Sequence, residues 1–486
     1  MSNLSELLPS GGGQNVGSFV ASGTLSNGQT VALKTDGKVE AVGISSEAVG
    51  TTQTWSGTSA AYNMRAVYDP DQQKVVIAYR GTSNYGYAIV GDVDPSNNSI
   101  TFGTPELWRS SFSIVQAIGY DTVNDKIAVF FQDVAAGSHG KARVGTVSGS
   151  TISFVSSTVT YNAGSTEATE VVFNPDQGVF LVVYKDNAFI GYPFGVVGTI
   201  SSGEISFGSE TSLDNQGTSY LAITYNTTTS SYVFVYNKTS STQQVCYQVP
   251  TTSGTTVTAG SRTLITLNGS TTAQGKYTKL SSDNASNTVF LTIVNSYNNN
   301  YASSIAATLS GSTLTFGTEN VFYSSGAVYE LGSTYDIDAK KLVVSYADTS
   351  QNGVVIPATV SGTTLTFGSP TTFRSALTGN LRNVYDSSHK RVFISYAENN
   401  TGYGGAVVYA AESTNASNFI GITGQAISDT ATGNVDMLGG INSQQTSLTI
   451  ASKYYVQDNG TLGTTVTSTF AGQAISATTL NIRDLT

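Results

Sequence analysis

The chain has 486 residues, of which 39% are hydrophobic and only 11% are charged, and it contains 50 glycines. Helical bundles, coiled coils and doubly wound α/β enzymes need more helix-forming charged residues, and charged disorder is excluded because 27 Tyr and 20 Phe can bury a large core. A net charge of −10 disfavours nucleic acid as a partner, and no apolar run is long enough to predict membrane insertion.

The N-terminal part of the chain divides into two predicted segments. Residues 1–15 contain LSELLP and a run of three glycines, and we interpret them as an anchoring arm without the basic and apolar regions of a secretion signal. Residues 16–48 contain QTVALKTDGKV from Gln29, which predicts two strands joined by an Asp-Gly hairpin turn.

The C-terminal residues 415–486 resemble the N-terminal segment. IGITGQAI from Ile420 matches VGISSEAV from Val42, and KYYVQDNGTL from Lys453 parallels the Asp-Gly hairpin. We therefore predict one small β docking domain assembled from residues 16–48 and 415–486.

The intervening residues 49–414 carry a twelve-residue motif at roughly the ~50-residue spacing of propeller blades. The motif has an aromatic residue, then Asp or Asn, a polar turn, and alternating apolar residues. It should form an inner strand, an Asx-type turn and a second strand. Six copies begin at Tyr68, Tyr120, Phe173, Tyr225, Tyr335 and Tyr385, and a worn copy that lacks the initial aromatic residue begins at Ser282.

A second marker, of the type LTFG, predicts the outer strand of each blade, as in the copy around Phe102. No such strand follows the last motif, but VGTTQTW from Val49 to Trp55 precedes the first and aligns with FGTPELW from Phe102 to Trp108. The prediction is an all-β chain: a seven-bladed β-propeller whose N-terminal strand closes the last blade, plus the small β domain.

The terminal segments resemble a known class of protein. The pattern GITGQAISDTATGNVDMLGGINSQQTSLTIASKYYVQDNGTL and the opening MSNLSELLPSGGGQNV are similar to segments of tailed-phage virion proteins, especially from marine phages, and VALKTDGKVEAVGI is similar to head-decoration domains. The resemblance implies a virion structural protein at the virion surface, with other virion proteins as partners, and it carries no catalytic residues.

One position on the inner strands is expected to form a ring around the central channel, because it lies three residues before each motif and side chains alternate along a strand. A sialidase would need clustered arginines with a Tyr nucleophile, and this ring is too sparse for that chemistry. A water-filled channel is therefore the favoured interpretation. The charged members of the predicted ring are Arg65, Glu170, Lys279 and Arg382, and the others are Ala117, Ala222 and Gly332.

Tyrosines gather in loops that should share one rim. Tyr beside Asn and Gly suits carbohydrate or protein contact, although packing at strand ends explains the same residues equally well. The candidate binding residues are Tyr85, Tyr87, Tyr297, Tyr301 and Tyr403.

We expect no cofactor and no metal site. His139 and His389 fall in different loop types, and DVDPSNNS from Asp92 is interpreted as an extended hairpin rather than a calcium loop. Cys246 lies in an apolar strand pattern and is not interpreted as a nucleophile.

The leading hypothesis is a non-enzymatic phage structural protein, a tail-fibre or appendage subunit that docks by its terminal domain and exposes the propeller to a host-surface receptor or glycan. The alternatives are a capsid decoration protein, a stand-alone lectin, and a propeller glycan hydrolase that acts on host polysaccharide with Glu170 as the nominated carboxylate. Fold-level analogy also allows a homo-oligomer.

Overall fold

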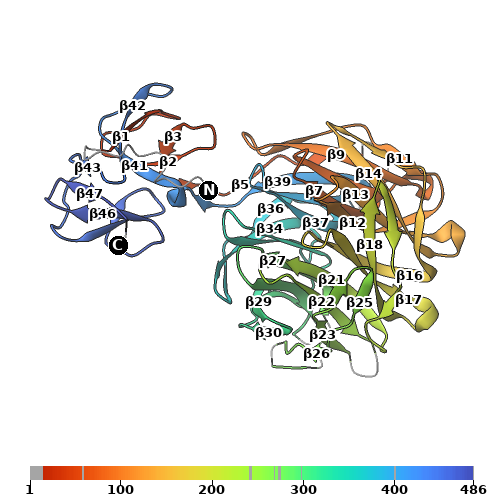
Figure 1. Ribbon diagram of the computed structural model, residues 1–486. Coiled ribbons are helices and arrows are strands. Elements are labelled where there is room, and N and C mark those ends of the chain that lie inside the picture. The colour runs from red at the N-terminus through yellow and green to blue at the C-terminus, as the bar shows by residue number, and fades with distance from the viewer. Residues whose placement is uncertain are drawn as a thin grey trace. The chain divides into compact units, whose positions relative to one another are not determined.

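The computed structural model describes residues 15–56, 60–239, 243–267, 269–271, 275–296, 298–398 and 401–484. The chain divides into two compact units, one of Met1–Glu47 with Glu412–Thr486 and one of Ala48–Ala411. Both consist of antiparallel sheets, and the fold is all-β (Figure 1). Among the described residues, no helix has the length and apolar character needed to cross a lipid bilayer.

The larger unit is propeller-like, with short meanders that follow one another around it in chain order (Figure 1). The first meander is β7 (Tyr62–Asp69), β8 (Lys74–Arg80), β9 (Gly86–Asp94), β10 (Ser99–Phe102) and β11 (Glu106–Arg109). The next strands are β12 (Ser113–Asp121), β13 (Lys126–Asp133), β14 (His139–Ser148), β15 (Thr151–Phe154), β16 (Val159–Asn174), β17 (Val179–Asp186), β18 (Tyr192–Ser201), β19 (Glu204–Phe207) and β20 (Thr211–Ser212).

The second half of this unit continues the pattern. Its strands are β21 (Thr218–Asn226), β22 (Ser231–Lys238), β23 (Gln244–Gln248), β24 (Thr251–Ser253), β25 (Thr256–Thr258), β26 (Thr263–Leu264), β27 (Gly275–Asp283), β28 (Thr288–Asn295), β29 (Tyr301–Ser310), β30 (Thr313–Phe316) and β31 (Asn320–Tyr323). They are followed by β32 (Leu331–Asp336), β33 (Lys341–Ala347), β34 (Gly353–Ser361), β35 (Thr364–Phe367), β36 (Thr371–Arg374), β37 (Thr378–Asp386), β38 (Arg391–Glu398) and β39 (Tyr403–Ala410). Short 3-10 turns are η2 (Thr82–Asn84), η3 (Val134–Ala136) and η4 (Asn187–Phe189).

The second strand of each meander is apolar on both faces, because sheets pack against it from both sides. In β8, Val75 and Ile77 belong to one buried cluster, whereas Val76 and Ala78 belong to the next. This explains why the sequence motif shows a nearly continuous apolar run rather than an alternation of apolar and polar residues.

The predicted Asx-type turns are confirmed. The Asp or Asn that follows the aromatic residue of the motif accepts hydrogen bonds from backbone N–H groups two or three residues later, as Asp69 does from Gln72 at 2.9 Å. The same bond is made by Asp121, Asn174, Asn226, Asp283, Asp336 and Asp386.

One strand departs from the expectation of separate sheets. The strand β16 has 16 residues; its first part pairs with β14 and its second part with β17, so two meanders merge into a nine-stranded sheet. The outer strand of one meander therefore continues into the inner strand of the next without a loop.

The segment before the first meander pairs with the last one. Strands β5 (Ala48–Val49) and β6 (Gln53–Thr54) both pair with β39, and the indole N–H of Trp55 donates to the carbonyl of Gly405 at 3.0 Å. Trp55 covers Gly404, where an added Cβ would lie 2.2 Å from the indole. Trp108 covers Gly86 in the same way, with a corresponding distance of 2.3 Å.

The inner strands β7, β12, β16, β21, β27, β32 and β37 contact one another in chain order, and β37 also contacts β7. They place one side chain per meander at the same level, which positions the candidate site.

The smaller unit interleaves strands from both ends of the chain. One five-stranded sheet has the order β1-β42-β41-β2-β3, a second has the order β43-β47-β46-β44-β45, and β4 pairs with β40 in a two-stranded sheet. The predicted Asp-Gly turn joins β2 to β3. Residues 1–14 of the predicted arm lie outside the described residues. The elements are β1 (Val16–Val20), β2 (Thr30–Leu33), β3 (Val39–Ala41), β4 (Ile44–Ser45), β40 (Ser413–Thr414), η5 (Ala416–Asn418), β41 (Phe419–Thr423), β42 (Thr432–Met437), β43 (Ile441–Asn442), β44 (Lys453–Val456), β45 (Leu462–Gly463), β46 (Phe470–Ala474) and β47 (Leu480–Ile482).

Candidate functional site

The four charged residues of the predicted ring line one cavity in the larger unit. Arg65 of β7, Glu170 of β16, Lys279 of β27 and Arg382 of β37 surround about 190 Å³, together with Ala117 of β12. We call this space the cation cavity. Ala222 and Gly332, at the equivalent positions of β21 and β32, are not among its lining residues.

A repeated backbone irregularity precedes the ring position. In β7, β16, β21, β27 and β37 the pairing register shifts directly before the ring residue, which is a β-bulge. Bulges change the direction of a strand and of the side chains that follow. Left-handed backbone at residues other than glycine is costly and gathers at functional sites. The residues two positions before the ring that adopt it are Asn63, Ala168, Tyr220, Tyr277 and Asn380.

The cations of the cavity are poorly compensated. Burial lowers the pKa of Lys279 to about 8, with the positive charge of Arg382 as the next cause, and burial and Arg382 lower the pKa of Arg65 to about 10. The negative charge of Glu170 acts in the opposite direction on both groups. Among the described residues, no ion pair joins Glu170 to a cation. The cavity therefore has excess positive charge in a chain whose net charge is −10.

The two guanidinium groups are fixed at one end and free at the other. One terminal nitrogen of Arg65 donates to the carbonyl of Met64 at 3.0 Å, and one of Arg382 donates to the carbonyl of Leu381 at 2.6 Å. The Nε of Arg65 is buried and has no hydrogen-bond partner in the described part of the chain. These contacts hold the side chains in place while leaving donors for an anionic ligand.

A second carboxylate near the cavity was missed by the sequence reasoning. Glu330 raises the pKa of both Arg65 and Lys279 through its negative charge. It lies two residues before Gly332 and just before β32 begins at Leu331. A search of the residue two positions before each ring residue would have found Glu330.

The structure places four of the five candidate rim tyrosines among its described residues. Tyr87 is half-buried and stacks on Tyr79 with ring centroids 5.7 Å apart. Tyr85 follows the 3-10 turn η2, and Tyr301 and Tyr403 begin strands β29 and β39 in different sheets; all three are half-buried. Tyr297 lies outside the described residues.

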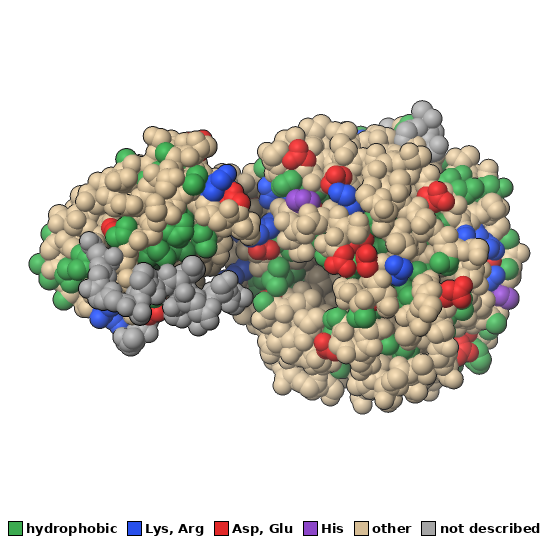
Figure 2. Space-filling model, turned by 45° about the horizontal axis from the view of Figure 1, so that its top comes forward, with side chains coloured by type: hydrophobic (Ala, Val, Ile, Leu, Met, Phe, Trp, Pro, Cys, Tyr) green, Lys and Arg blue, Asp and Glu red, His purple; other side chains and the backbone are tan. Residues whose placement is uncertain are grey.

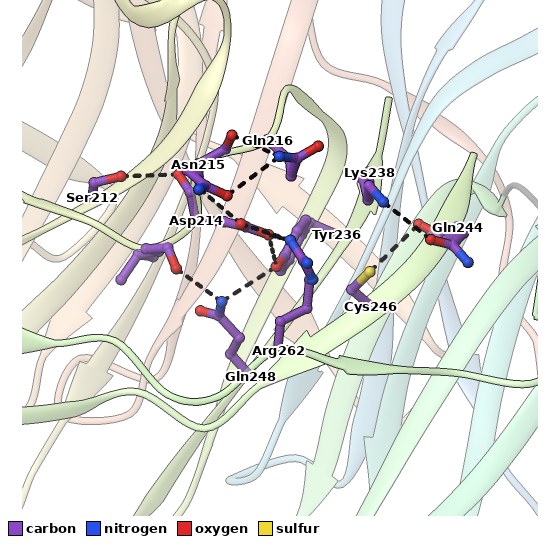
Figure 3. Close-up of polar contacts among 11 residues, drawn as sticks. Ser212, Asp214, Asn215, Gln216, Tyr236, Lys238, Gln244, Cys246, Gln248 and Arg262 are labelled. Atoms are coloured by element: carbon purple, nitrogen blue, oxygen red, sulfur yellow. Dashed lines mark hydrogen bonds and ion pairs between the residues drawn. The ribbon is translucent and has the colours of Figure 1, made fainter. Parts of the chain in front are cut away.

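A different polar cluster surrounds Asp214, as Figure 3 shows. The Tyr236 hydroxyl donates to the carboxylate at 2.5 Å, and Arg262 donates to both carboxylate oxygens at 2.8 and 2.9 Å. Burial and Asp214 raise the pKa of Tyr236. Tyr184 occupies the same place in the preceding motif and donates to Glu210 at 2.5 Å. Because the arrangement recurs and its groups are bonded to one another, we interpret it as a structural fastening of loops to the sheet.

Cys246, drawn in the same view, is buried on β23. Burial raises the pKa of its thiol to about 11, so the reactive thiolate is scarce at neutral pH. The interpretation of Cys246 as a strand residue rather than a nucleophile agrees with this position.

Metal-binding groups are sparse in the described part of the chain, where no three His, Cys, Asp or Glu side chains gather as a metal would require. Asp94 of the DVDPSNNS segment accepts bonds from Ser96, and His389 contacts Asp386 at 2.7 Å. On the face of the larger unit in Figure 2, acidic and basic side chains are interspersed among neutral polar ones.

Comparison with known proteins gives structural matches only. No family model and no curated protein matches the chain. Among similar solved structures, a putative 6-phosphogluconolactonase from Bacteroides uniformis is 10% identical, covers 73% of this chain and 96% of its own, and has a TM-score of 0.44. The periplasmic gluconolactonase PpgL of Pseudomonas aeruginosa is 12% identical, covers 74% and 97%, and has a TM-score of 0.46. A triple arginine-to-alanine mutant of AofleA from Arthrobotrys oligospora is 10% identical, covers 58% and 78%, and has a TM-score of 0.39.

These findings correct the functional prediction. Two of the three proteins are named as lactonases, which are enzymes, and none is named as a virion protein. The hypothesis of a non-enzymatic phage structural protein, whether tail-fibre subunit or capsid decoration, is contradicted and is withdrawn. It came from a resemblance limited to the terminal segments, which left the propeller-like unit without a functional argument. The virion-surface location and the virion or host partners were not tested by any comparison.

Proposed function

We propose that the larger unit is a closed seven-bladed β-propeller in which residues 48–55 complete the last blade. The cyclic order of contacts between the inner strands supports this architecture, as does the pairing of β5 and β6 with β39. In such a ring the cation cavity lies at the central channel, where the inner strands face one another.

We further propose that the propeller is a hydrolase for a small anionic substrate bound in the cation cavity. The observation that carries this proposal is the convergence of three cationic side chains, from three separate strands, with one carboxylate on about 190 Å³. A chain with 22 basic and 32 acidic residues has no general excess of cations to place there. Unpaired cations in a partly buried cavity are costly unless an anion accompanies them.

The side chains suit acid–base hydrolysis. Arg65 and Arg382 hold the anionic group of the substrate through charge-assisted hydrogen bonds. Glu170 takes a proton from a water molecule as the water oxygen attacks the substrate. Lys279, with a pKa of about 8, gives a proton to the leaving oxygen as its bond to the substrate breaks. The proton that Glu170 gained then passes through solvent to restore Lys279.

The size of the cavity limits the substrate. Ordinary small-molecule pockets occupy roughly 300–1,000 Å³, so this cavity admits a small group or the end of a chain and not the interior of a polysaccharide. A glycosidase remains a second candidate because Glu330 supplies another carboxylate near Lys279. Glycosidases require such a pair at about 5–9.5 Å.

The test is calorimetric titration with sulfate, followed by assays on lactones, aryl esters and aryl glycosides that carry a carboxylate or phosphate. Arg382→Gln should weaken sulfate binding by about 10- to 100-fold, since a hydrogen bond to a charged group contributes about 1.5–3 kcal/mol. Lys38→Gln removes one exposed positive charge from the smaller unit and serves as the matched control. Equal sulfate affinity in the wild type and Arg382→Gln would refute the anion site.

Turnover separates the two candidate reactions. Glu170→Gln should reduce hydrolysis by at least about 10²-fold while sulfate still binds, because a general base contributes about 10²–10⁴ to the rate. Loss of glycoside cleavage with Glu330→Gln, and no cleavage of esters or lactones, would favour the glycosidase. Full turnover with Glu170→Gln would remove Glu170 from the mechanism.

A further inference from the structure

A larger cavity lies along the same inner strands as the cation cavity. It occupies about 530 Å³ and shares Ala66 and Asn383 with the cation cavity, so the two spaces adjoin. We call it the polar chamber. The lining residues that matter here are Thr224 of β21, Ser281 and Ser282 of β27, Ser333 and Thr334 of β32, and Asn383 of β37.

The chemistry of the polar chamber differs from that of the cation cavity. None of its lining residues is Asp, Glu, Lys or Arg. Hydroxyl and amide groups come from β21, β27, β32 and β37. Aliphatic surface comes from β7 and β16 and also from, or directly after, the strands that carry the polar groups; the aliphatic lining residues are Ala66, Val67, Val172, Leu280, Ile337 and Val384. The chamber therefore combines hydrogen-bonding groups with apolar surface.

Two of these polar groups have no hydrogen-bond partner in the described part of the chain. The hydroxyls of Ser281 and Ser333 are buried and make no hydrogen bond to any described residue. A buried hydroxyl without a partner is unfavourable, so such groups usually mark a place that water or a ligand completes. The hydroxyls of Thr224 and Ser282 lie 3.3 Å apart, and the Ser282 hydroxyl is also 3.0 Å from the carbonyl of Tyr225 and 3.1 Å from Oδ1 of Asn284, so this pair is bonded within the chain.

Asn383 sits at the junction of the two spaces in a fixed orientation. Its Oδ1 accepts a hydrogen bond from Ser345 at 2.5 Å, and its Nδ2 donates to the carbonyl of Val343 at 3.1 Å. Gly332 allows this close approach, because an added Cβ would lie 2.4 Å from Oδ1 of Asn383. Asn383 is therefore an uncharged group, held in place by two hydrogen bonds, that belongs to the lining of both spaces.

We propose that the polar chamber is a subsite for a polyhydroxylated, uncharged segment of the ligand whose anionic group occupies the cation cavity. This assignment rests on the proposed function for the anionic end only. A sugar-like chain matches this mixed lining, since its hydroxyls can bond to the Ser and Thr side chains while its C–H groups pack on aliphatic residues such as Ala66, Val67 and Val172. The substrate class is then an anionic polyol, such as a sugar acid or a derivative of one.

The first experiment uses the wild-type chain and three six-carbon probes in calorimetric titrations. Gluconate carries both the anion and the hydroxyls, hexanoate carries the anion alone, and sorbitol carries the hydroxyls alone. Gluconate should bind at least 10-fold more tightly than hexanoate. Equal affinity for gluconate and hexanoate would overturn the subsite.

Variants localise the effect. Thr334→Val and Ser281→Ala should each reduce the gluconate advantage at least threefold and leave hexanoate affinity unchanged. Thr366→Val, on the exposed side of β35, is the control for the same chemical change. Thermal melting checks that each variant folds, and the comparison of probes on the wild type needs no variant. Variants that weaken gluconate and hexanoate equally would contradict the proposal.

The sorbitol arm separates the two proposals. If neither gluconate nor hexanoate binds, the anion site fails, but sorbitol binding that is lost in Thr334→Val would still establish the polar chamber. If hexanoate binds, and the affinities for sorbitol and gluconate are the same in the wild type, Thr334→Val and Ser281→Ala, the anion site is supported and the polar chamber is not a subsite.

Discussion

Replacing Trp55 by alanine tests whether the N-terminal strand completes the last sheet. The indole is 6% exposed, packs edge-on to Tyr79 with ring centroids 4.8 Å apart, and donates to the carbonyl of Gly405. Beyond this side chain, β5 and β6 each pair with β39 over only two residues. Trp55 is therefore the main side-chain anchor of the segment.

The expected loss follows from burial. Replacing a buried Trp by Ala costs about 3–5 kcal/mol. If that loss is confined to the segment, amide exchange in residues 48–56 and 403–410 should accelerate by about 10² to 4 × 10³, because each 1.4 kcal/mol is a factor of ten. The melting temperature should also fall by several degrees.

Hydrogen exchange measured by mass spectrometry checks this, with Trp108→Ala as the matched control. Trp108 covers Gly86 within the first meander, so its loss should accelerate exchange in residues 86–94 and 104–110 and leave residues 48–56 protected. Wild-type exchange of residues 48–56 at the rate of an unfolded chain, or unchanged exchange of residues 403–410 in Trp55→Ala, would refute the closure.

Four further predictions concern charged and buried groups. Asp214→Ala should lower the free energy of unfolding by about 2–4 kcal/mol in urea titrations, since it removes the partner of both the Tyr236 hydroxyl and Arg262. Arg262→Gln should lower it by only about 1 kcal/mol, because Arg262 is exposed. Equal small losses in the two variants would contradict the fastening role. Sulfate affinity should fall as the pH rises through about 8, where Lys279 loses its proton, and Lys279→Gln should abolish that dependence. Because the pKa of Lys279 is lower in the folded chain, the folded chain binds this proton less tightly than the unfolded chain does. Lys279 should therefore make the free energy of unfolding rise between pH 8 and 10.5. Wild type and Lys279→Gln with the same dependence of unfolding free energy on pH would exclude this effect. Cys246 should react with a thiol reagent at pH 8 about a hundredfold more slowly in the native chain than in denaturant. Rapid labelling of the native chain would show that the thiol is not buried.

The repeat made much of the fold predictable. Turn chemistry placed Asp or Asn at the same point of each motif, and the structure uses those side chains to cap the turns. The merger of two meanders through β16 was not predictable, because Asn162, Gly164 and Ser165 are turn-type residues at the point where the strand continues.

The candidate site was predictable only in part. Counting three residues back from each motif brought Arg65, Glu170, Lys279 and Arg382 to one cavity, because the inner strands share one register. Glu330 was missed because it lies just before its strand and not at the counted position. The polar chamber was missed because Ser281 and Thr334 are common residues in strands, and their shared location becomes visible only when the six strands are placed together. The functional prediction failed because it rested on terminal segments that contain none of these groups.

The pairing of Trp55 with Gly405 joins residues 350 positions apart, which has a consequence during synthesis. A ribosome releases the N-terminal strands long before it makes β39, so they wait with unpaired backbone groups while the intervening meanders form. Edges in that condition invite wrong pairing with other chains. The two-residue lengths of β5 and β6 shorten that exposed edge, which limits aggregation of the nascent chain.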